Sequence, residues 1–562
     1  MSKPASQEQL VNLGLTLDQA VALHRQGRLD EAEKIYARIL KSVPDQVETL
    51  QLMTQLKLAA GKPADALRLM TTVVAARPNS PDALVLLGHV LRRLKREDEA
   101  LVNFDKALAL EPRHIDALGC RGDALLSRRQ GDEALQCFDK ILSIDARHPE
   151  ARVNRGAALA MLGRYEEALA EFDFILAAMP QHGMALYNRA NALSALGREA
   201  ESLAVYDRVL ALAPQHAVAW NNRGNVLLAL KRHADAIESF DKAIALNAEY
   251  ADAHFNRSLA LLATGDYVRG FAAYEWRWKR SGMPTTRRNY GRPLWLGEYP
   301  LERKTILVHA EQGLGDTIQF ARYIPLLARG GASVVMEAPA ELTTLLARLD
   351  GVAQIVARGE ALPKFDVQCP LGSLPLAFKT GLTNVPADVP YLAADEKRVA
   401  KWRPQIEALT GPRVALVWAG NISHPNDRNR SIALSKLKPL LDDGGIRFVS
   451  LQRELRNSDA DLLKTLPKVS HFGGELEDFE DTAAIVSLCD MVIGVDTAVV
   501  HLAAAMGRPT WVLLPYSPDW RWTLDGEHSP WYPAARLFRQ PQLGDWGSVV
   551  AAVRSALDGL GN

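Results

Sequence analysis

Small and large apolar residues recur at a fixed period through the first half of the chain. A small residue stands at every 34th position: Ala32, Ala66, Ala100, Ala134, Ala168, Ser202, Ala236 and Gly270. Four residues after each small residue comes a large one: Tyr36, Met70, Phe104, Phe138, Phe172, Tyr206, Phe240 and Tyr274. Twelve residues after most of the small residues comes a helix breaker: Pro44, Pro78, Pro112, Pro180 and Pro214. This pattern predicts stacked two-helix hairpins, because a small residue lets two helices approach closely and a proline ends the second helix.

We expect the large residue of each period to fill the gap to the next hairpin. The eight in-phase matches resemble the tetratricopeptide repeat. The resemblance implies an α-solenoid, a tetratricopeptide superhelix, over residues 13–284, preceded by an N-terminal tail of residues 1–12. Arrays of this kind are scaffolds that bind peptides on their concave face, so the resemblance also implies a polypeptide partner.

A second register of the same period consists of asparagines at the sixth position of the predicted first helices. These residues are Asn154, Asn188, Asn222 and Asn256. Asparagine is a poor helix former, so four asparagines at the same helix position indicate a role other than helix formation. A side-chain amide can bond an extended peptide backbone without reading its sequence. The register resembles the asparagine ladder of the O-linked N-acetylglucosamine transferases. The alternative is that these side chains bond neighbouring repeats or cap turns.

The period changes after residue 284. Residues 285–304 are rich in proline, glycine and basic residues, and we expect a linker that packs on both neighbours. From residue 305 strand-length apolar runs alternate with helical segments: TILVHA, TIQFARYIPLLA, ASVVMEA, AELTTLLARL and VAQIVA. After a helical stretch at 395–410 the alternation restarts: RVALVWAG, LSKLKPLLDD, RFVSLQ, VSHF, DTAAIVSLC, MVIGV and TWVLLP. This order predicts parallel sheets in two α/β Rossmann-like halves, over 305–394 and 395–562.

Composition narrows the class of protein. The 562 residues are too many for one core, so two to four domains are expected. Lys plus Arg and Asp plus Glu both number 66, so no net charge recruits nucleic acid or an anionic membrane. The four cysteines lack metal-ligand spacing, which favours a reducing compartment. The first residues have no apolar signal-peptide core, and no apolar stretch reaches the length of a membrane span. A cytoplasmic protein of open oligomeric state is expected.

The segment GVDTAVVHLAAAM, residues 494–506, joins a predicted strand to a predicted helix. Asp496 lies at the carboxyl end of the strand, and Asp496 or Thr497 is expected to cap the helix. A helix N-terminus binds anions, because it offers free N–H groups and the positive end of the helix dipole. His501 lies one turn further along. The alternative is a capping aspartate with a hydrogen-bonded core histidine.

The continuation DTAVVHLAAAMGRPTWVLLP resembles the donor-binding segment of glycosyltransferase family 9, the heptosyltransferase-like enzymes. Gly507 and Pro509 match the family's pattern as well. The resemblance implies that this element holds the diphosphate of a nucleotide sugar between two Rossmann-like domains, the arrangement called GT-B. It covers roughly residues 303–540.

The stretch ILVHAEQGLGDTIQFARYIPLL resembles the family's opening, in which a strand leads through glycine and aspartate into a helix. Gly313 and Gly315 would let the backbone approach the donor closely. The resemblance implies that Asp316 is the general base, because an inverting transfer needs a carboxylate to take the proton of the acceptor hydroxyl. The alternative is that Asp316 caps the helix at Thr317.

The polar loop after RVALVWAG is the third match. The resemblance implies that a basic residue here contacts the donor phosphates without a metal, and Arg430 is the best positional match. The donor-site candidates of this half are Trp418, Asn421, His424, Arg430, Gln452, Asp496, Thr497 and His501. The alternative for the loop is a solvated basic segment. The aromatic segments PYSPDWRW and HSPWYP either stack on a base or sugar or cover the core.

Together these features predict a protein glycosyltransferase, metal-independent and inverting, with a nucleotide sugar as co-substrate and no other cofactor. The architecture resembles the O-linked N-acetylglucosamine transferases and the bacterial repeat-containing flagellin glycosyltransferases, which implies a Ser or Thr hydroxyl as acceptor, flagellin's among them. One alternative is a glycolipid or lipopolysaccharide precursor as acceptor, with repeats that dock assembly proteins. Another is a scaffold whose transferase half has lost activity.

Overall fold

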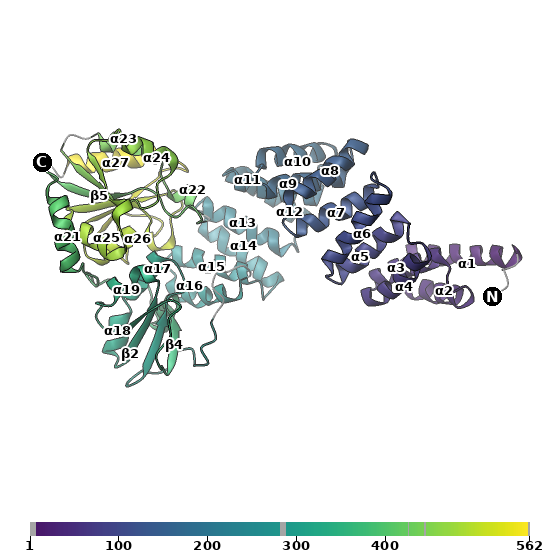
Figure 1. Cartoon of the computed structure of the whole chain (residues 1–562), viewed down its shortest axis with the longest axis horizontal. Coiled ribbons are helices and arrows are strands. Elements are labelled where there is room, and N and C mark those ends of the chain that lie inside the picture. Colours follow the sequence, from purple (N-terminus) through teal and green to yellow (C-terminus); the bar gives the residue numbers. More distant parts are fainter. Residues whose placement is uncertain (1–6, 281–287, 425, 443–444, 560–562) are drawn as a thin grey trace. The chain divides into compact units, whose positions relative to one another are not determined.

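The computed structural model describes residues 7–280, 288–424, 426–442 and 445–559. The chain divides into two compact units, residues 1–214 and 215–562 (Figure 1). The first unit holds six repeat hairpins. The second unit holds the last two hairpins and both β-sheets. None of the described helices is both long and apolar enough to cross a membrane.

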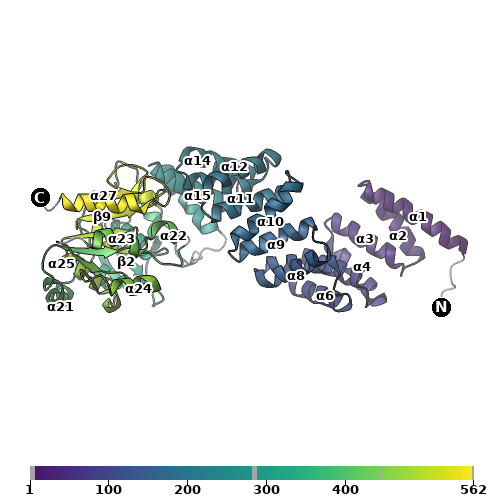
Figure 2. The ribbon, with the colours of Figure 1, turned by 90° about the horizontal axis from the view of Figure 1, so that it is seen from above.

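Eight consecutive hairpins occupy the described part of the repeat array (Figure 1, Figure 2), as the period predicts. The first helices are α1 (Gln7–Arg25), α3 (Val47–Ala59), α5 (Pro81–Arg93), α7 (Ile115–Ser127), α9 (Pro149–Met161), α11 (Gly183–Ala195), α13 (Ala217–Ala229) and α15 (Ala251–Ala263). The second helices are α2 (Leu29–Ser42), α4 (Pro63–Ala76), α6 (Glu97–Leu110), α8 (Gly131–Ile144), α10 (Tyr165–Ala178), α12 (Glu199–Leu212), α14 (His233–Leu246) and α16 (Tyr267–Tyr274). Residues 7–12, predicted as part of a tail, belong to α1, and residues 1–6 lie outside the described part.

The small and large residues of the period are buried, and each breaker proline follows its helix by two residues. Some of the rings also fill a space inside their own hairpin, which was not predicted. A methyl group on Gly88 would lie 2.3 Å from the ring of Phe104, which belongs to the same hairpin. The same pairing recurs in three further hairpins: Phe138 with Gly122, Phe172 with Gly156, and Phe240 with Gly224. These four rings therefore close their own hairpins, and the Phe104 cluster also continues to the next first helix through residues such as Ala117, as predicted.

Two parallel sheets form the second half, as predicted. The first sheet has the order β3-β2-β1-β4, with β1 (Thr305–His309), β2 (Ser333–Ala338), β3 (Val352–Ala357) and β4 (Val367–Pro370). The second has the order β10-β9-β8-β5-β6-β7, with β5 (Arg413–Val417), β6 (Arg447–Ser450), β7 (Val469–His471), β8 (Met491–Val495), β9 (Thr510–Leu514) and β10 (Ala535–Arg539). The strands β4 and β10 were not predicted, because one is four residues long and the other follows a proline-rich loop.

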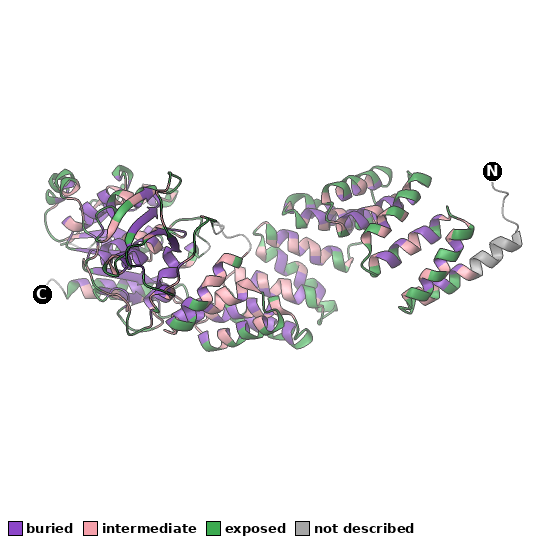
Figure 3. Ribbon diagram, turned by 90° about the horizontal axis from the view of Figure 1, so that it is seen from below, coloured by how far each residue is buried: buried purple, intermediate pink, exposed green. Residues whose placement is uncertain are grey.

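Helices cover both faces of the second sheet (Figure 1). Alternate strand residues divide between two cores: Val414 and Leu416 face α23 (Leu434–Leu441) and α27 (Trp546–Asp558), whereas Ala415 and Val417 face α25 (Phe479–Leu488) and α26 (Ala498–Ala505). The remaining helices are α17 (Leu314–Ala321), α18 (Ile324–Arg329), α19 (Ala340–Leu346), α20 (Leu374–Ala377), α21 (Glu396–Glu407), α22 (Asp427–Arg430) and α24 (Asn457–Leu463). Figure 3 shows buried positions concentrated in the sheets and on the inner faces of the hairpins.

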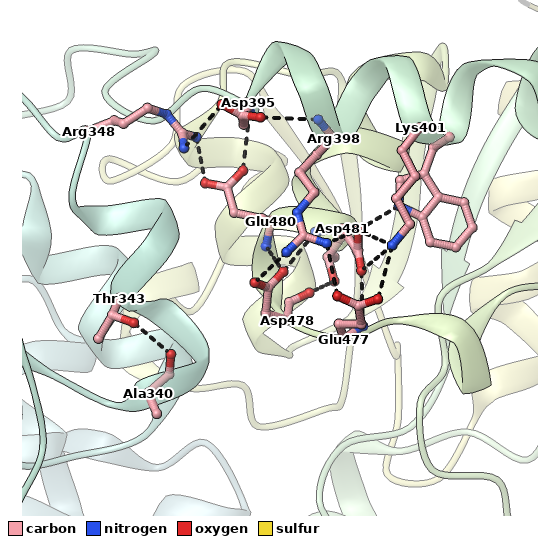
Figure 4. Close-up of polar contacts among 12 residues, drawn as sticks. Ala340, Thr343, Arg348, Asp395, Arg398, Lys401, Glu477, Asp478, Glu480 and Asp481 are labelled. Atoms are coloured by element: carbon pink, nitrogen blue, oxygen red, sulfur yellow. Dashed lines mark hydrogen bonds and ion pairs between the residues drawn. The ribbon is translucent and has the colours of Figure 1, made fainter.

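Charged side chains tie α21 to α25 and to the first half (Figure 4). Arg398 of α21 lies 3.1 Å from Asp481 of α25, whose side chain is fully buried. Arg348, just beyond α19, forms an ion pair of 2.5 Å with the fully buried Glu480 of α25. Removing one partner of a buried pair leaves an uncompensated charge, so these contacts fix how the two halves meet.

The last repeat is joined to the first sheet by a second buried network. Arg277 lies in the 3₁₀ segment η1 (Glu275–Lys279) and is fully buried. Its guanidinium lies 3.1 Å from Glu311 and donates to Ser373 over 2.7 Å. Tyr274 is hydrogen-bonded to Gln312, one residue before Gly313. In the predicted linker, Trp295 donates its N–H to Gln368 at the edge of the sheet; residues 285–287 lie outside the described part.

Candidate active site

Asp316 lies at the third position of α17, the helix that follows β1 along the chain. Its carboxylate accepts the backbone N–H of Gly313 over 3.0 Å, so it does cap the helix, at Gly313 and not at Thr317 as the alternative proposed. The same carboxylate forms an ion pair with Arg521. Gly313 thus fixes the carboxylate through its backbone. Asp316 keeps a quarter of its side chain exposed, which leaves it accessible to a substrate.

Arg521 is the main contact that sequence reasoning missed. It lies in the 3₁₀ segment η4 (Trp520–Trp522), within a stretch noted only for its aromatic residues. Its guanidinium contacts Asp316, Asp519 over 2.8 Å, and the side-chain oxygen of Gln319. Burial acts to lower the pKa of Arg521, but the carboxylates of Asp519 and Asp316 outweigh it and raise the pKa above its usual range. Arg521 is therefore a fixed positive charge beside the candidate base.

The segment around Asp496 has the predicted local structure. Strand β8 ends at Val495, Thr497 is the N-cap, and α26 begins at Ala498. The carboxylate of Asp496 lies 3.4 Å from Nε2 of the buried His501. Burial acts to raise the pKa of Asp496, but the hydrogen bond and charge of His501, together with the charge of Arg521, lower it. Asp496 is therefore ionised at neutral pH.

His501 has a structural role on its other side. Its Nδ1 is hydrogen-bonded to the hydroxyl of Tyr532 over 3.0 Å, and its ring lies 5.2 Å from that of Trp522. A methyl group on Gly315 would lie 3.0 Å from His501, so this glycine lets α17 approach α26 closely. Gly315 thus serves the contact between the two halves.

The loop after β5 brings a cation and a histidine to the same region. The guanidinium of Arg430 lies against Gly420, where a methyl group would approach it to 2.5 Å. Burial lowers the pKa of His424, and Arg430 lowers it further, while the carboxylates of Asp496, Asp519 and Asp316 act in the opposite direction. These five side chains therefore share one electrostatic environment. Asn421 accepts hydrogen bonds from Ser423 and shapes the loop.

Two predicted donor contacts turn out to support the site from inside. The indole of Trp418 is fully buried and donates its N–H to Asp459 over 2.9 Å, so its side chain cannot reach a donor. Gln452 is also buried. Its amide accepts the backbone N–H groups of Trp418 and Ala419, and donates to the carbonyl of Ala419. Both residues hold the chain where β5 ends, a role that their spacing alone did not reveal.

Several buried polar atoms at this site have no hydrogen-bond partner among the described residues. They include the hydroxyl of Thr497, Nε of Arg430 and Nε2 of Gln319, although Nε of Arg430 lies 4.0 Å from the carboxylate of Asp427. Buried polar groups are nearly always satisfied, so unpaired ones call for an explanation. The Thr497 hydroxyl lies at the N-terminus of α26 and Arg430 is a cation, and both groups suit an anionic ligand.

The asparagine register has the predicted positions on α9, α11, α13 and α15, and all four side chains are half-buried. Asn154 donates to Asp123 of the preceding repeat over 2.9 Å, and Asn256 donates to Asn221 of its preceding repeat over 3.0 Å. Asn222 accepts a hydrogen bond from Asn221. Bonds between repeats, the alternative interpretation, are therefore present for Asn154 and Asn256, whereas peptide binding stays a prediction.

Comparison with known proteins is consistent with this architecture. A tetratricopeptide repeat model matches residues 11–47, 54–117, 120–182 and 163–217, and a second one matches residues 217–250. The model described as glycosyltransferase family 9 (heptosyltransferase) matches residues 451–543, which include β8, α26 and Arg521. The repeat matches lie before residue 284, where the sequence period changes, and the family 9 match lies after it.

Individual proteins are similar to parts of the chain. The chain is 29% identical to protein FlbA of Caulobacter vibrioides over 322 residues, which are 52% of this chain and 53% of FlbA, so it spans about half the length of that curated relative. Among solved structures it is similar to a tetratricopeptide repeat protein from Parabacteroides merdae, at 22% identity, covering 44% of this chain and 98% of that one, with a TM-score of 0.39. It is also similar to a repeat protein from Thermus thermophilus, at 21% identity, covering 33% and 100%, with a TM-score of 0.30. The chain thus carries tetratricopeptide repeats in its first half and, at residues 451–543, a C-terminal segment that matches glycosyltransferase family 9.

Proposed function

We propose that the protein transfers a sugar from a nucleotide sugar to a hydroxyl group of a polypeptide, without a metal and with inversion. The observation that carries the proposal is the close approach of two helix starts. In α17, which carries Asp316, a methyl group on Gly315 would lie 3.0 Å from His501 of α26, the helix that Thr497 caps within the family 9 match. Ligands of parallel sheets bind beyond the carboxyl ends of the strands, where these residues lie.

The donor diphosphate is proposed to bind at the N-terminus of α26. The free N–H groups and dipole of that helix favour an anion, and the Thr497 hydroxyl and the Arg430 guanidinium each offer an unused polar atom. Arg430 would offset the charge that develops on the leaving diphosphate. His424, whose pKa is lowered, would be neutral at pH 7 and able to donate one hydrogen bond.

Asp316 is proposed to act as the general base. Its carboxylate would take the proton of the acceptor hydroxyl while the new bond to the anomeric carbon forms and the bond to the diphosphate breaks. The backbone N–H of Gly313 and the guanidinium of Arg521 hold the carboxylate in place. Holding a reacting group in position lowers the entropic part of the barrier.

A polypeptide acceptor is proposed because the chain devotes eight repeats to a scaffold of the peptide-binding kind. Asn154, Asn188, Asn222 and Asn256 would contact the backbone of the acceptor, and a Ser or Thr hydroxyl would receive the sugar. Flagellin is the acceptor to test first, on the resemblance given above. A reaction in the cytoplasm remains part of this proposal.

The test is transfer itself, followed by intact-protein mass spectrometry. The full chain is incubated with flagellin and, in turn, with sugars carried on UDP, GDP, ADP and CMP, with and without EDTA. The proposal expects a mass gain of one sugar or more that requires the enzyme and persists in EDTA. Release of free sugar with no modified protein in any mixture would contradict the polypeptide acceptor, and loss of transfer in EDTA would contradict metal independence.

A further inference from the structure

A groove in the first unit runs along the first helices of repeats two to five. It encloses about 630 Å³ and is lined by side chains of α3, α5, α7, α8 and α9. The lining positions repeat along each helix with the spacing of one helical face: Glu48, Gln51, Leu52 and Gln55 on α3 recur as Asp82, Val85, Leu86 and His89 on α5, and as Asp116, Gly119, Cys120 and Asp123 on α7. Successive first helices touch one another, so this face is continuous from repeat to repeat.

The groove is acidic although the chain as a whole is neutral. Five of the lining residues carry a carboxylate, and no lining residue is Lys or Arg. Four of these carboxylates repeat every 34 residues at the second position of a first helix: Glu48, Asp82, Asp116 and Glu150. Among the described residues Glu48, Asp116 and Glu150 form no ion pair, and Asp82 contacts only His114. A local excess of negative charge therefore faces the groove, and the cation of the chain that acts on it, Arg92, lies outside the lining.

The fifth carboxylate lies deeper in the same groove. Asp123 is half-buried, and its hydrogen bond within the described part of the chain comes from the amide of Asn154. Burial raises the pKa of Asp123, the charge of Arg92 lowers it, and the charge of Glu150 raises it. A positive ligand in the groove would act in the same direction as Arg92 and offset the contribution of Glu150. The carbonyl oxygen of Asn154 has no partner within the described chain and can accept a hydrogen bond from such a ligand.

Acidic residues in a first helical turn have a simpler explanation, because they also stabilise the helix dipole. The apolar part of the lining argues for more than that. It includes Leu52, Leu86, Ile115 and Ile141. Lysine and arginine bury their aliphatic stems on apolar surface while the charged head reaches a carboxylate. A bare metal ion would leave these apolar side chains unused, and a nucleic acid would be repelled by the carboxylates.

We infer that this groove binds an extended polypeptide segment that carries Lys or Arg side chains at regular intervals, one for each carboxylate of the 34-residue register. Packed helices lie about 8–10 Å apart. An extended chain advances about 3.3–3.6 Å per residue. Positive residues at roughly every third position would therefore meet successive carboxylates. The identification of this segment as part of the acceptor rests on the proposed function. The binding of a basic segment to the groove does not.

The experiment uses the full chain and no nucleotide sugar, so its outcome is independent of the transferase. A fluorescein-labelled peptide of twelve residues with Lys at every third position and Ser and Ala between is titrated by fluorescence anisotropy. The groove variant carries Glu48→Gln, Asp82→Asn, Asp116→Asn and Glu150→Gln. We expect it to bind at least about tenfold more weakly, since each exposed pair contributes modestly and four are lost together.

The repeats offer a matched control. Asp30, Asp98, Asp132 and Glu166 hold the same second position on the second helices α2, α6, α8 and α10, are exposed, and do not line the groove. Neutralising these four residues changes the net charge and the helix dipoles as much as the groove variant does, but it leaves the groove intact. We therefore expect this control to bind the peptide within about twofold of wild type. A peptide with Glu in place of Lys should not bind.

Three outcomes would overturn the inference. They are absence of binding to the lysine peptide, unchanged affinity of the groove variant, and equal loss in both variants. If the fourfold variant melts at a lower temperature than the control, the double variant Asp82→Asn with Asp116→Asn replaces it, with an expected loss of about threefold or more. Unchanged affinity in that double variant would likewise contradict the groove.

Discussion

The carboxylate of Asp316 has two neighbours with different consequences. The backbone N–H of Gly313 fixes its position at the start of α17, and Arg521 supplies a permanent positive charge from the other half of the domain. A general base must accept a proton during the reaction, whereas a purely structural carboxylate only has to keep these two contacts. The two roles can be separated, because a substitution can keep the cap while removing the basicity.

Asp316→Asn should lower the turnover number by roughly 10²–10⁴-fold. The asparagine oxygen can still accept the N–H of Gly313, so α17 should keep its start, and the affinity for the donor should change little. The control is Asp519→Asn, which removes the other carboxylate of Arg521 without touching the candidate base. Steady-state kinetics and the melting temperature are measured for both. Equal turnover in the two variants would leave Asp316 with a structural role only.

At the residue scale the sequence identified the positions that have local signals. Asp496 and Thr497 could be placed because a strand followed by a capping residue is visible in the sequence. Arg521 could not, because its partners Asp316 and Gln319 are some 200 residues away and only the fold brings them together. Trp418 was misjudged for a related reason: the end of a strand predicts where a residue lies but not which way its side chain points.

At the scale of elements, the repeat hairpin depends on a glycine beneath an aromatic ring. In α7 the two glycines differ in this respect. A methyl group on Gly122 would lie 2.6 Å from the fully buried ring of Phe138, whereas one on Gly119 would find its nearest neighbour at 3.9 Å. One helix therefore contains both a glycine that packing requires and one that packing does not require.

Gly122→Ala should destabilise the array by about 1–3 kcal/mol, because the buried ring has no space to move into. Gly119→Ala should instead be neutral or stabilising by about 0.5–1 kcal/mol, since alanine is the better helix former. Urea unfolding of the full chain, followed by circular dichroism, gives both midpoints. A lower midpoint for Gly119→Ala than for Gly122→Ala would show that the ring does not close the hairpin in this way.

Most elements could be predicted because their periods are strong. Runs such as MVIGV and VAQIVA coincide with β8 and β3 residue for residue. The predicted helix TIQFARYIPLLA is divided into α17 and α18, because Pro325 cannot continue a helix in its interior. Strand β4 was not predicted, because its four residues are too few to show a period and because its pairing with β1 is a tertiary contact.

At the scale of the whole molecule, the compact units do not follow the change of sequence period. The period changes after residue 284, but the second unit already begins at Gln215 and includes two repeat hairpins. Tyr274, Arg277 and Tyr267 of the last repeat contact Gln312, Glu311 and Trp531 of the transferase domain. These long-range contacts have no signal in the local sequence. The last repeat is therefore structurally part of the transferase domain.

Replacing Asn154, Asn188, Asn222 and Asn256 with alanine should impair transfer to a polypeptide while leaving donor hydrolysis unchanged. Each lost amide contact contributes about 0.5–1.5 kcal/mol, so the combined effect on the acceptor is large. Transfer, hydrolysis and melting temperature are measured side by side in the fourfold variant. Equal retention of both activities would favour the glycolipid acceptor. Loss of both with a lower melting temperature would show that the bonds of Asn154 and Asn256 hold the repeats together.

The central claim is that the C-terminal half holds a nucleotide sugar by its diphosphate, and calorimetric titration of the full chain with UDP, GDP, ADP and CDP tests it most directly. The account predicts that one of them binds once per chain in the presence of EDTA. Arg430→Ala should weaken this binding by roughly 10- to 100-fold, as expected for a hydrogen bond to a charged group. Lys436→Ala, an exposed cation of α23 in the same half, should leave it unchanged. Failure of all four to bind, or equal affinity of the Arg430→Ala variant and the wild type, would contradict the account.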